Sequence, residues 1–366
     1  MKDPRVEKLA SVLVDYSTRV KKGDIVLVHC NGTAAVPLMK EVYSLCLERG
    51  AGYVEYQISL SDMGRVFYDN ASEDQLGYFP DHKFEFMKKA DVFIGISAVE
   101  NSMELANSRQ DSMIKHEKVI RPILDERVDN CRWVICRYPT YGAAQDAAMS
   151  LDEYEDFLFS ACNIDYAKAS EKQERLKKMM EKASDVRIVA SDTDINFSIK
   201  GMPAIKCDGR RNIPDGEVYT APVRDSVEGF ITYNCPSIYQ GKEFSSVRLE
   251  FSAGKIVSAT SPGMDEELNK ILDTDEGARH IGEFSMGTNP NITRPMRNTL
   301  FDEKISGSIH LTPGKCYDIC DNGNKSAIHW DLVKILKGDG EIYFDNELIQ
   351  KDGIFVHEEL EELNEL

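Results

Sequence analysis

Residues 25–59 have the sequence IVLVHCNGTAAVPLMKEVYSLCLERGAGYVEYQIS. The stretch begins with a short continuous apolar run, IVLVHC, and ends with a second extended run, YVEYQIS. Such runs are typical of strands that are covered on both faces. Between them, Leu38, Val42 and Cys46 recur at helical spacing, and Gly50 is placed to end the helix. The stretch therefore predicts two parallel strands joined by a helix.

The same pattern continues through the first half of the chain. Further apolar runs follow at 91–98, DVFIGISA, and at 132–139, RWVICRYP. Strands that alternate with helices favour a doubly wound α/β sheet with parallel strands. The turns CNGTAAVP and TYGAAQDAAM contain one glycine each, and the chain has no Walker-type loop. Nucleotide binding is therefore a minor alternative for this sheet.

The pattern changes after a polar, helix-forming stretch at 151–184, where short alternating segments separated by turns begin. The segments at 251–259 and 343–356 resemble β-hairpins. We therefore expect two domains: an α/β N-terminal domain with its helical connection, residues 1–184, and a mainly antiparallel β (α+β) catalytic domain that binds metal, residues 185–366.

The amino-acid composition limits which binding partners and which cellular compartment we expect for this protein. The 44 Lys and Arg residues against 62 Asp and Glu give a net charge of −18, which disfavours nucleic acid and anionic membrane surfaces. Nine cysteines without a regular framework indicate a reducing compartment. No apolar segment is long enough to cross a bilayer, and the first residues lack a secretory signal. We expect a cytoplasmic protein whose closing run, HEELEELNEL at 357–366, forms a solvated acidic helix.

Carboxylates and imidazoles occur together in the second half, in the segments GEVYTAP, GEFSMG, IHLTPG and SAIHWD. These candidate ligands are Glu217, Glu283, His310, His329 and Asp331. Such a mixture suits Zn²⁺, Co²⁺ or Mn²⁺, and carboxylates beyond a three-ligand site would allow a pair of ions. On an extended strand, His329 and Asp331 would project to the same face, so they could hold one ion.

Each of these residues also has an ordinary interpretation. Glu217 and Glu283 each follow a glycine, and a glutamate in that position often caps a turn and faces water. Gly216 and Gly282 would also let another backbone segment approach closely, so that each carboxylate could point into a cavity. His310 could be a half-buried, hydrogen-bonded core residue. Glu303 is a second-tier site candidate, with a salt bridge to Lys304 as the alternative.

Tyr317 lies seven residues after His310, and Pro313 and Gly314 interrupt any helix between them. A loop could still return the phenol to the ligands. There its hydroxyl could stabilise an oxyanion.

The order of these motifs is more specific than any one of them. The run GEFSMGTNPNITRPMRNTLFDEKISGSIHLTPGKCY, followed by GNKSAIHWDLV, resembles the thermophilic-type metalloaminopeptidase family, which includes the aminopeptidase T and aminopeptidase S types and is leucyl aminopeptidase-like. NIPDGEVYTAPVRDSVEGFITYN and EKLASVLVDYSTRVKKGDIVLV are similar to the same family. The resemblance covers nearly the whole chain.

The resemblance implies a cytoplasmic homodimer with a large enclosed cavity and two divalent metal ions. By position, it implies that Glu283 contacts both ions and that Tyr317 is catalytic. The ligands that it implies are Glu217, Glu283, His310, His329 and Asp331.

Residues and resemblance together predict a metal-dependent aminopeptidase that removes the first residue from short peptides with a free N-terminus. Two ions (Zn²⁺, Co²⁺ or Mn²⁺) with a bridging water would supply the nucleophile. Glu283 would move the proton, and Tyr317 would donate to the oxyanion. The alternatives are another metal-dependent amidohydrolase or dipeptidase, or a non-enzymatic protein that binds a small ligand and a structural metal.

Overall fold

The computed structural model describes residues 3–365. Contacts within the chain divide it into two compact units. The first unit contains the residues up to 163 together with 209–214, and the second contains 164–208 and the residues from 215 onward. Helix α9 (Tyr166–Lys182) therefore belongs to the second unit. The domain division at residue 184 stays a prediction.

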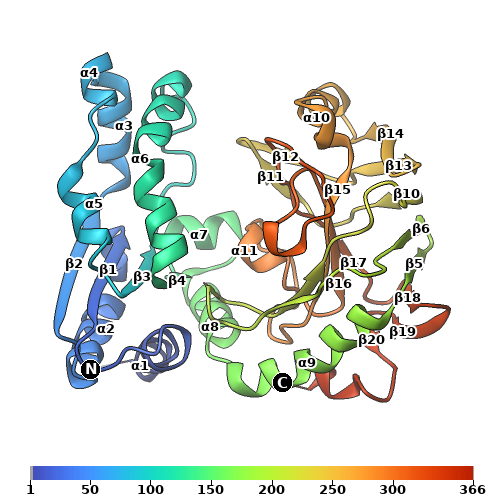
Figure 1. Ribbon diagram of the computed structural model, residues 1–366, viewed down its shortest axis with the longest axis horizontal. Coiled ribbons are helices and arrows are strands. Elements are labelled where there is room, and N and C mark those ends of the chain that lie inside the picture. The colour runs from blue at the N-terminus through green and yellow to red at the C-terminus, as the bar shows by residue number, and fades with distance from the viewer. Residues whose placement is uncertain (1–2, 366) are drawn as a thin grey trace. The chain divides into compact units, whose positions relative to one another are not determined.

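The first unit contains a five-stranded sheet in the order β2-β1-β3-β4-β8, and every neighbouring pair is parallel (Figure 1). Its strands are β1 (Ile25–Asn31), β2 (Tyr53–Ser59), β3 (Val92–Ser97), β4 (Arg132–Arg137) and β8 (Asn212–Ile213). Its helices are α1 (Pro4–Ser11), continued by a π-helical turn (Val12–Ser17), α2 (Val36–Glu48), α3 (Ser61–Asn70), α4 (Glu73–Leu76), α5 (Asp81–Met87), α6 (Gln110–Asn130), α7 (Tyr141–Asp146) and α8 (Leu151–Cys162), with a 3₁₀ turn at Thr33–Ala35.

The parallel α/β sheet expected from the first half is confirmed. Val26, Val28 and Cys30 on β1 are fully buried, as the continuous apolar run predicts. Helix α2 packs on β1 and β2, while α6 packs on β4 and against α5. Gly50 follows α2 with a φ of +80°, a conformation that glycine adopts without steric cost.

The second unit is mainly antiparallel sheet, as predicted. One sheet has the order β14-β13-β10-β6-β5-β18-β19-β20, a second has the order β17-β16-β15-β9-β7, and β11 pairs with β12 (Figure 1). The strands are β5 (Asp185–Ala190), β6 (Thr193–Ser198), β7 (Ile205–Cys207), β9 (Glu217–Thr220), β10 (Glu228–Thr232), β11 (Ser237–Tyr239), β12 (Lys242–Phe244), β13 (Arg248–Ser252), β14 (Lys255–Thr260), β15 (Ile281–Gly287), β16 (Ser308–Pro313), β17 (Leu332–Ile335), β18 (Glu341–Phe344), β19 (Glu347–Lys351) and β20 (Ile354–Phe355). Besides α9, the α-helices are α10 (Asp265–Leu272) and α11 (Thr299–Asp302), and 3₁₀ turns occupy Glu276–Arg279, Asp318–Cys320 and Glu361–Asn364. Both predicted hairpins are present, as β13-β14 and as β18-β19-β20.

The core of this unit lies between its two large sheets. Phe197 on β6 and Phe284 on β15 meet edge to face, with ring centroids 5.0 Å apart. Because side chains alternate along a strand, a strand that places Phe284 and Met286 in this core aims its other side chains away from it. That second face of β15 carries the candidate site.

The acidic run at the end of the chain does not form the predicted solvated helix. It contains a 3₁₀ turn, Glu361–Asn364, and Leu360 and Leu363 are each only 1% exposed. The Asn364 side chain accepts a hydrogen bond from the Phe355 backbone N–H and donates one to the Phe355 carbonyl. These contacts hold the run against the sheet, so the helix prediction is wrong; residue 366 lies outside the described residues. Within residues 3–365, no helix has the length and apolar composition needed to cross a membrane.

Candidate metal centre

Strand register places the predicted ligands on one face of the five-stranded sheet. Glu283 and Ser285 point away from the core on β15. Ser285 lies opposite His310 on β16, and Glu283 lies opposite Thr312. Glu217, the first residue of β9, pairs next to this row at the end of β15. Three neighbouring strands therefore present their polar side chains together.

All five predicted ligands come within reach of one another. The Nε2 atom of His310 is 3.1 Å from Oε1 of Glu283 and 3.7 Å from Oε2 of Glu217. The Nε2 atom of His329 is 3.6 Å from Oε2 of Glu283 and 3.3 Å from Oδ1 of Asp331. The donor atoms thus form two groups, Glu217–Glu283–His310 and Glu283–His329–Asp331, each within 4.8 Å. Glu283 belongs to both groups and turns one carboxylate oxygen toward each histidine.

The loop that follows β16 carries the remaining candidate ligands, His329 and Asp331, to the same face. Thr312 donates from Oγ1 to Oδ1 of Asp331 over 2.7 Å, which fixes that carboxylate. Nδ1 of His329 lies 2.7 Å from the carbonyl oxygen of Lys315. Since only a protonated nitrogen can donate to that carbonyl, Nε2 is left facing the carboxylates.

Two glycines make room for the site glutamates. A Cβ atom on Gly282 would lie 2.5 Å from the carbonyl oxygens of both Gly314 and Lys315. Gly216 has a φ of +137°, and a Cβ there would lie 2.8 Å from Cβ of Asn289. Glycine in front of each glutamate is therefore required by close backbone packing.

Gly282→Ala should reduce metal binding and activity together, because a methyl group would push β15 away from the loop at 314–315 and displace the Glu283 carboxylate. Gly64→Ala is the matched control, since the nearest atom to a Cβ on this helical glycine is a leucine methyl 3.9 Å away. We expect the control to keep full activity and to be as stable or more stable, because alanine is favoured over glycine in helices by about 1 kcal/mol. Metal analysis and peptidase assays on both variants check this; equal behaviour of the two would contradict it.

The electrostatics of the cluster are those of a cation site. Burial raises the pKa of Glu283, although the hydrogen bond with His310 acts to lower it. Burial would lower the pKa of His310, but that hydrogen bond and the nearby carboxylates raise it to about 10. In the same way, Asp331 and Glu283 outweigh burial and raise the pKa of His329 to about 9. In the metal-free protein, protons on the two histidines thus supply positive charge among the buried carboxylates.

The unsatisfied atoms show that the donor set fits divalent cations. Oε2 of Glu283 and Nδ1 of His310 are buried and have no hydrogen-bond partner among residues 3–365. Glu283 is 4% exposed and His310 is 1% exposed, so bulk water does not compensate. Carboxylate oxygens and imidazole nitrogens at these separations are the donors that zinc and related ions take.

A lysine whose burial the sequence did not indicate borders the cluster. Lys304 is fully buried, forms a close ion pair with Glu303, and lies 3.7 Å from Oε1 of Glu217. The alternative interpretation of Glu303 as the partner of Lys304 is therefore seen in the structure. Burial raises the pKa of the Glu303 carboxyl to about 8, although Lys304 lowers it. Neighbouring acidic and basic residues, as in FDEK, are typical of exposed segments. The sequence therefore does not indicate that Glu303 and Lys304 lie inside the protein.

Cys207 and Asp215 form a third close group with Glu217. Burial raises the pKa of the Cys207 thiol well above its ordinary value, so the Cys207 side chain keeps its proton.

The loop after β16 also returns Tyr317 to the site. Its ring centroid is 4.9 Å from that of His329 and 5.6 Å from that of Tyr219. Although Tyr317 is 47% exposed, its partial burial and the carboxylates of Glu283 and Asp331 raise its pKa above the ordinary value. Its hydroxyl therefore keeps its proton and can donate a hydrogen bond.

An α/β unit and an antiparallel unit with buried carboxylates and imidazoles on one sheet face define a two-unit protein with a candidate site for divalent metal ions. Residues 2–352 match the family model described as thermophilic metalloprotease (M29), and the chain belongs to this family. It is therefore an enzyme, a metal-dependent peptide hydrolase. The family resemblance inferred from the motifs is confirmed.

Curated relatives carry aminopeptidase names. Aminopeptidase 2 of Geobacillus stearothermophilus is 23% identical over 404 residues, which cover 96% of this chain and 95% of the relative. Aminopeptidase T of Thermus aquaticus is 36% identical over 140 residues, about a third of each chain.

Solved structures with the same fold include AmpT from Thermus thermophilus, with a TM-score of 0.81, 20% identity, and coverage of 96% of this chain and 99% of that one. The 2,5-dihydroxypyridine dioxygenase of Pseudomonas putida KT2440 matches with a TM-score of 0.62 and 14% identity, covering 97% of this chain and 98% of that one. At these identities the likeness concerns the fold.

Proposed function

We propose that this chain is an aminopeptidase that removes the N-terminal residue of short peptides at a site for two divalent metal ions. The observation that carries the proposal is the position of Glu283, whose two carboxylate oxygens face two separate groups of donors. Glu217 and His310 would hold one ion, His329 and Asp331 the other, and Glu283 both. The aminopeptidase names of the relatives support the choice of substrate.

The bound ions, Zn²⁺, Co²⁺ or Mn²⁺, would lower the pKa of a bridging water and polarise the scissile carbonyl. Glu283 would take the proton of the attacking water and deliver it to the leaving amine. Tyr317 would donate from its hydroxyl to the developing oxyanion. Thr312, which donates to Asp331, would keep that ligand oriented.

Tyr317→Phe should lower kcat by about 10²-fold while leaving metal content unchanged, because removal of one oxyanion donor costs about 10²- to 10³-fold. The measurement is steady-state hydrolysis of an aminoacyl reporter beside metal analysis of the same sample. Tyr53→Phe is the control, since Tyr53 lies on β2 of the first unit and its hydroxyl donates to Glu55 of the same strand. Unchanged kcat in Tyr317→Phe would remove Tyr317 from the mechanism.

The substrate proposal is tested by comparing a leucyl peptide with its N-acetylated form and with a series of dipeptides and longer peptides. We expect release of free amino acid only when the N-terminal amine is free. Equal cleavage of the acetylated peptide would favour another amidohydrolase, and cleavage of dipeptides alone would favour a dipeptidase. A protein that binds metal but cleaves no peptide would correspond to the binding-protein alternative.

We further propose that the protein works as a cytoplasmic homodimer. Light scattering of the purified full chain tests the assembly: a mass near twice the chain mass of 41.3 kDa supports it, and a mass near the chain mass contradicts it.

A further inference from the structure

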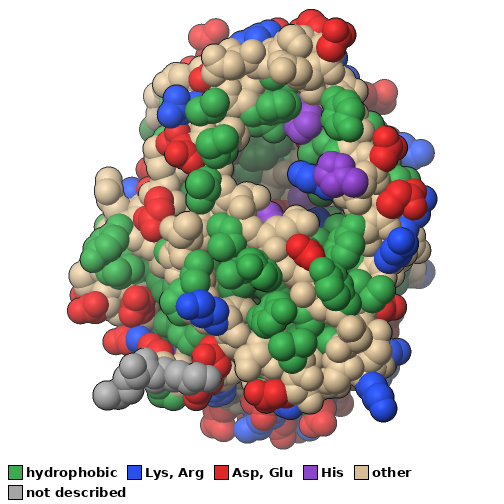
Figure 2. Space-filling model, turned by 90° about the vertical axis from the view of Figure 1, so that its left-hand side faces the viewer, with side chains coloured by type: hydrophobic (Ala, Val, Ile, Leu, Met, Phe, Trp, Pro, Cys, Tyr) green, Lys and Arg blue, Asp and Glu red, His purple; other side chains and the backbone are tan. Residues whose placement is uncertain are grey.

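The first unit contains a large cavity on one face of its parallel sheet. The cavity has a volume of about 820 Å³, enough for a small organic molecule. Strands β1, β2 and β3 form its floor, and helices α3, α5 and α6 with the loop after α4 form its walls. Figure 2 shows a hollow on the face of the first unit, with histidine and basic side chains among hydrophobic ones at its edge. All its lining residues belong to the first unit.

The floor departs from what a covered parallel sheet normally presents. On β1, Leu27 and His29 point to the cavity, and they pair in register with Glu55 and Gln57 of β2. A strand buried on both faces is usually apolar throughout. His29 on β1 departs from this rule, whereas Glu55 and Gln57 lie on the more exposed edge strand β2, so the floor offers polar groups to a ligand.

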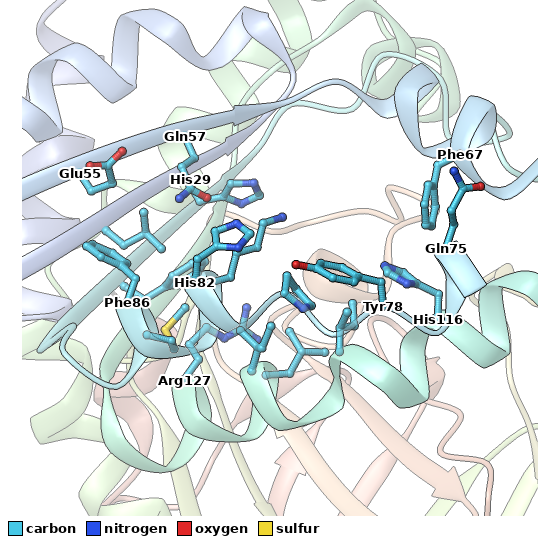
Figure 3. Close-up of a pocket in the computed structure, with 18 residues that line it drawn as sticks. His29, Glu55, Gln57, Phe67, Gln75, Tyr78, His82, Phe86, His116 and Arg127 are labelled. Atoms are coloured by element: carbon cyan, nitrogen blue, oxygen red, sulfur yellow. The ribbon is translucent and has the colours of Figure 1, made fainter. Parts of the chain in front are cut away.

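Basic side chains gather at one end of the cavity. Figure 3 shows His29 from β1 and His82 from α5 beside each other, with Arg127 of α6 on the same side. Lys83 also lines the cavity, and its charge and that of Arg127 act on His29. Within residues 3–365, neither Lys83 nor Arg127 forms an ion pair with a carboxylate.

Arg127 is held in place but left with unused donors. Its guanidinium lies over Phe93 and Trp133, 4.9 Å and 5.6 Å from their ring centroids. Its Nε–H is buried and has no hydrogen-bond partner among the described residues. An arginine that is fixed by stacking and lacks a partner presents its planar fork to an incoming anion.

The other end of the cavity is aromatic. His116 lies edge to face against Phe67, with ring centroids 4.9 Å apart, and its Nδ1 is 3.4 Å from the Leu76 carbonyl oxygen. Figure 3 places Tyr78 beside His116 at this end. Ile120 and Ile123 of α6 complete an apolar wall. This end suits the flat or branched body of a ligand.

The charges of the lining favour a monoanion. Lys83 and Arg127 carry two positive charges, and Glu55 supplies one negative charge, so one positive charge is left when the histidines are neutral. The Glu55 carboxylate already accepts a hydrogen bond from Tyr53 over 2.6 Å. Such a positive cavity is unexpected in a chain with a net charge of −18.

We propose that this cavity binds a small carboxylate with an apolar, preferably aromatic, body. The carboxylate contacts Arg127 and Lys83, with His29 and His82 as further donors, and the body lies against Phe67, Tyr78 and His116. His29, His82 and His116 lie far apart in the sequence, and the fold brings them to one cavity. The proposal does not depend on the activity of the second unit.

Calorimetric titration of the full chain tests the proposal, with 3-phenylpropionate as the probe. Its neutral amide, 3-phenylpropanamide, tests the need for the charge, and acetate tests the need for the apolar body. We expect 3-phenylpropionate to bind at least about tenfold more tightly than either. The amide lacks a charge-assisted contact, which contributes about one to two factors of ten to the affinity, and acetate lacks the apolar body whose burial favours binding. Binding of the amide as tight as that of the acid, or no binding of 3-phenylpropionate at millimolar concentration, would overturn the proposal.

Each titration is repeated with a chelator present, because carboxylates also bind metal ions. Retained binding supports the cavity as the site, and binding lost with the chelator would place the probe on metal and overturn the proposal. A failure of peptidase activity leaves this test unaffected.

Arg127→Gln and Lys83→Met should each weaken 3-phenylpropionate binding by about tenfold. Because Lys83 is exposed, we expect Lys83→Met to fold, and this variant can test the proposal if Arg127→Gln does not fold. Arg121→Gln is the control, since Arg121 is on the same helix, has a side chain 64% exposed, pairs with Asp125 and does not line the cavity. Unchanged binding in the folded cavity variants, or equal weakening in Arg121→Gln, would overturn the proposal.

Discussion

Glu283→Gln should lower the rate of peptide hydrolysis by about 10²- to 10⁴-fold, the range that positioned general acid–base groups contribute. The glutamine amide cannot take a proton, and its nitrogen cannot act as a carboxylate ligand. Because Glu283 lies 3.1 Å from His310 and 3.6 Å from His329, its loss affects both groups of donors. Metal content should therefore fall together with activity, which metal analysis and kinetics on the same preparation would measure.

Glu250→Gln is a suitable control for this result. Glu250 lies on β13 of the same unit, with a side chain 45% exposed and paired with Arg248. We expect this variant to keep the wild-type metal content and rate, since exposed ion pairs contribute little to stability. A Glu283→Gln variant that retains the wild-type rate would show that chemistry takes place elsewhere.

Lys304→Met should destabilise the metal-free protein by about 3–5 kcal/mol, the usual cost of removing one partner from a buried ion pair. Lys304 is fully buried, and it is paired with Glu303 and lies near Glu217. Without it, Glu303 would lose the positive charge paired with it, and Glu217 would lose one of the two positive groups that lie 3.7 Å away. Chemical denaturation of the metal-free wild type and variant would measure the difference in free energy of unfolding.

Lys334→Met separates this effect from the general effect of removing a buried lysine. Lys334 is 2% exposed and lies on β17 of the sheet that carries the candidate site, but its partner Asp192 has a side chain that is 42% exposed. Water can replace the lysine at Asp192, so the loss of stability should be clearly smaller. Equal losses in the two variants would contradict the special position of Lys304 among the site carboxylates.

The sequence predicted most of the fold because periodicity reports burial directly. The apolar run at 25–30 and the helical spacing at 38–46 gave β1 and α2, and the turn residues at 253–254 gave the β13-β14 hairpin. The acidic run at the end of the chain was predicted wrongly. Its leucines repeat at helical spacing, but contacts with the sheet decide its conformation, and no local pattern contains them.

The candidate site was predictable in its members and not in its arrangement. The register between β15 and β16, which sets His310 opposite Ser285, depends on tertiary packing. The burial of Lys304 beside acidic residues had no local signal for the same reason. The three histidines of the first-unit cavity come from β1, α5 and α6, so only the fold brings them together.

The most direct test of the two-ion site is titration of metal-stripped protein with Zn²⁺, Co²⁺ or Mn²⁺ while leucine release from a leucyl peptide is followed. We predict no activity without metal, and activity that rises until two equivalents are bound per chain. Full activity in the stripped protein, or saturation of metal binding without any release of leucine, would contradict the proposed aminopeptidase site.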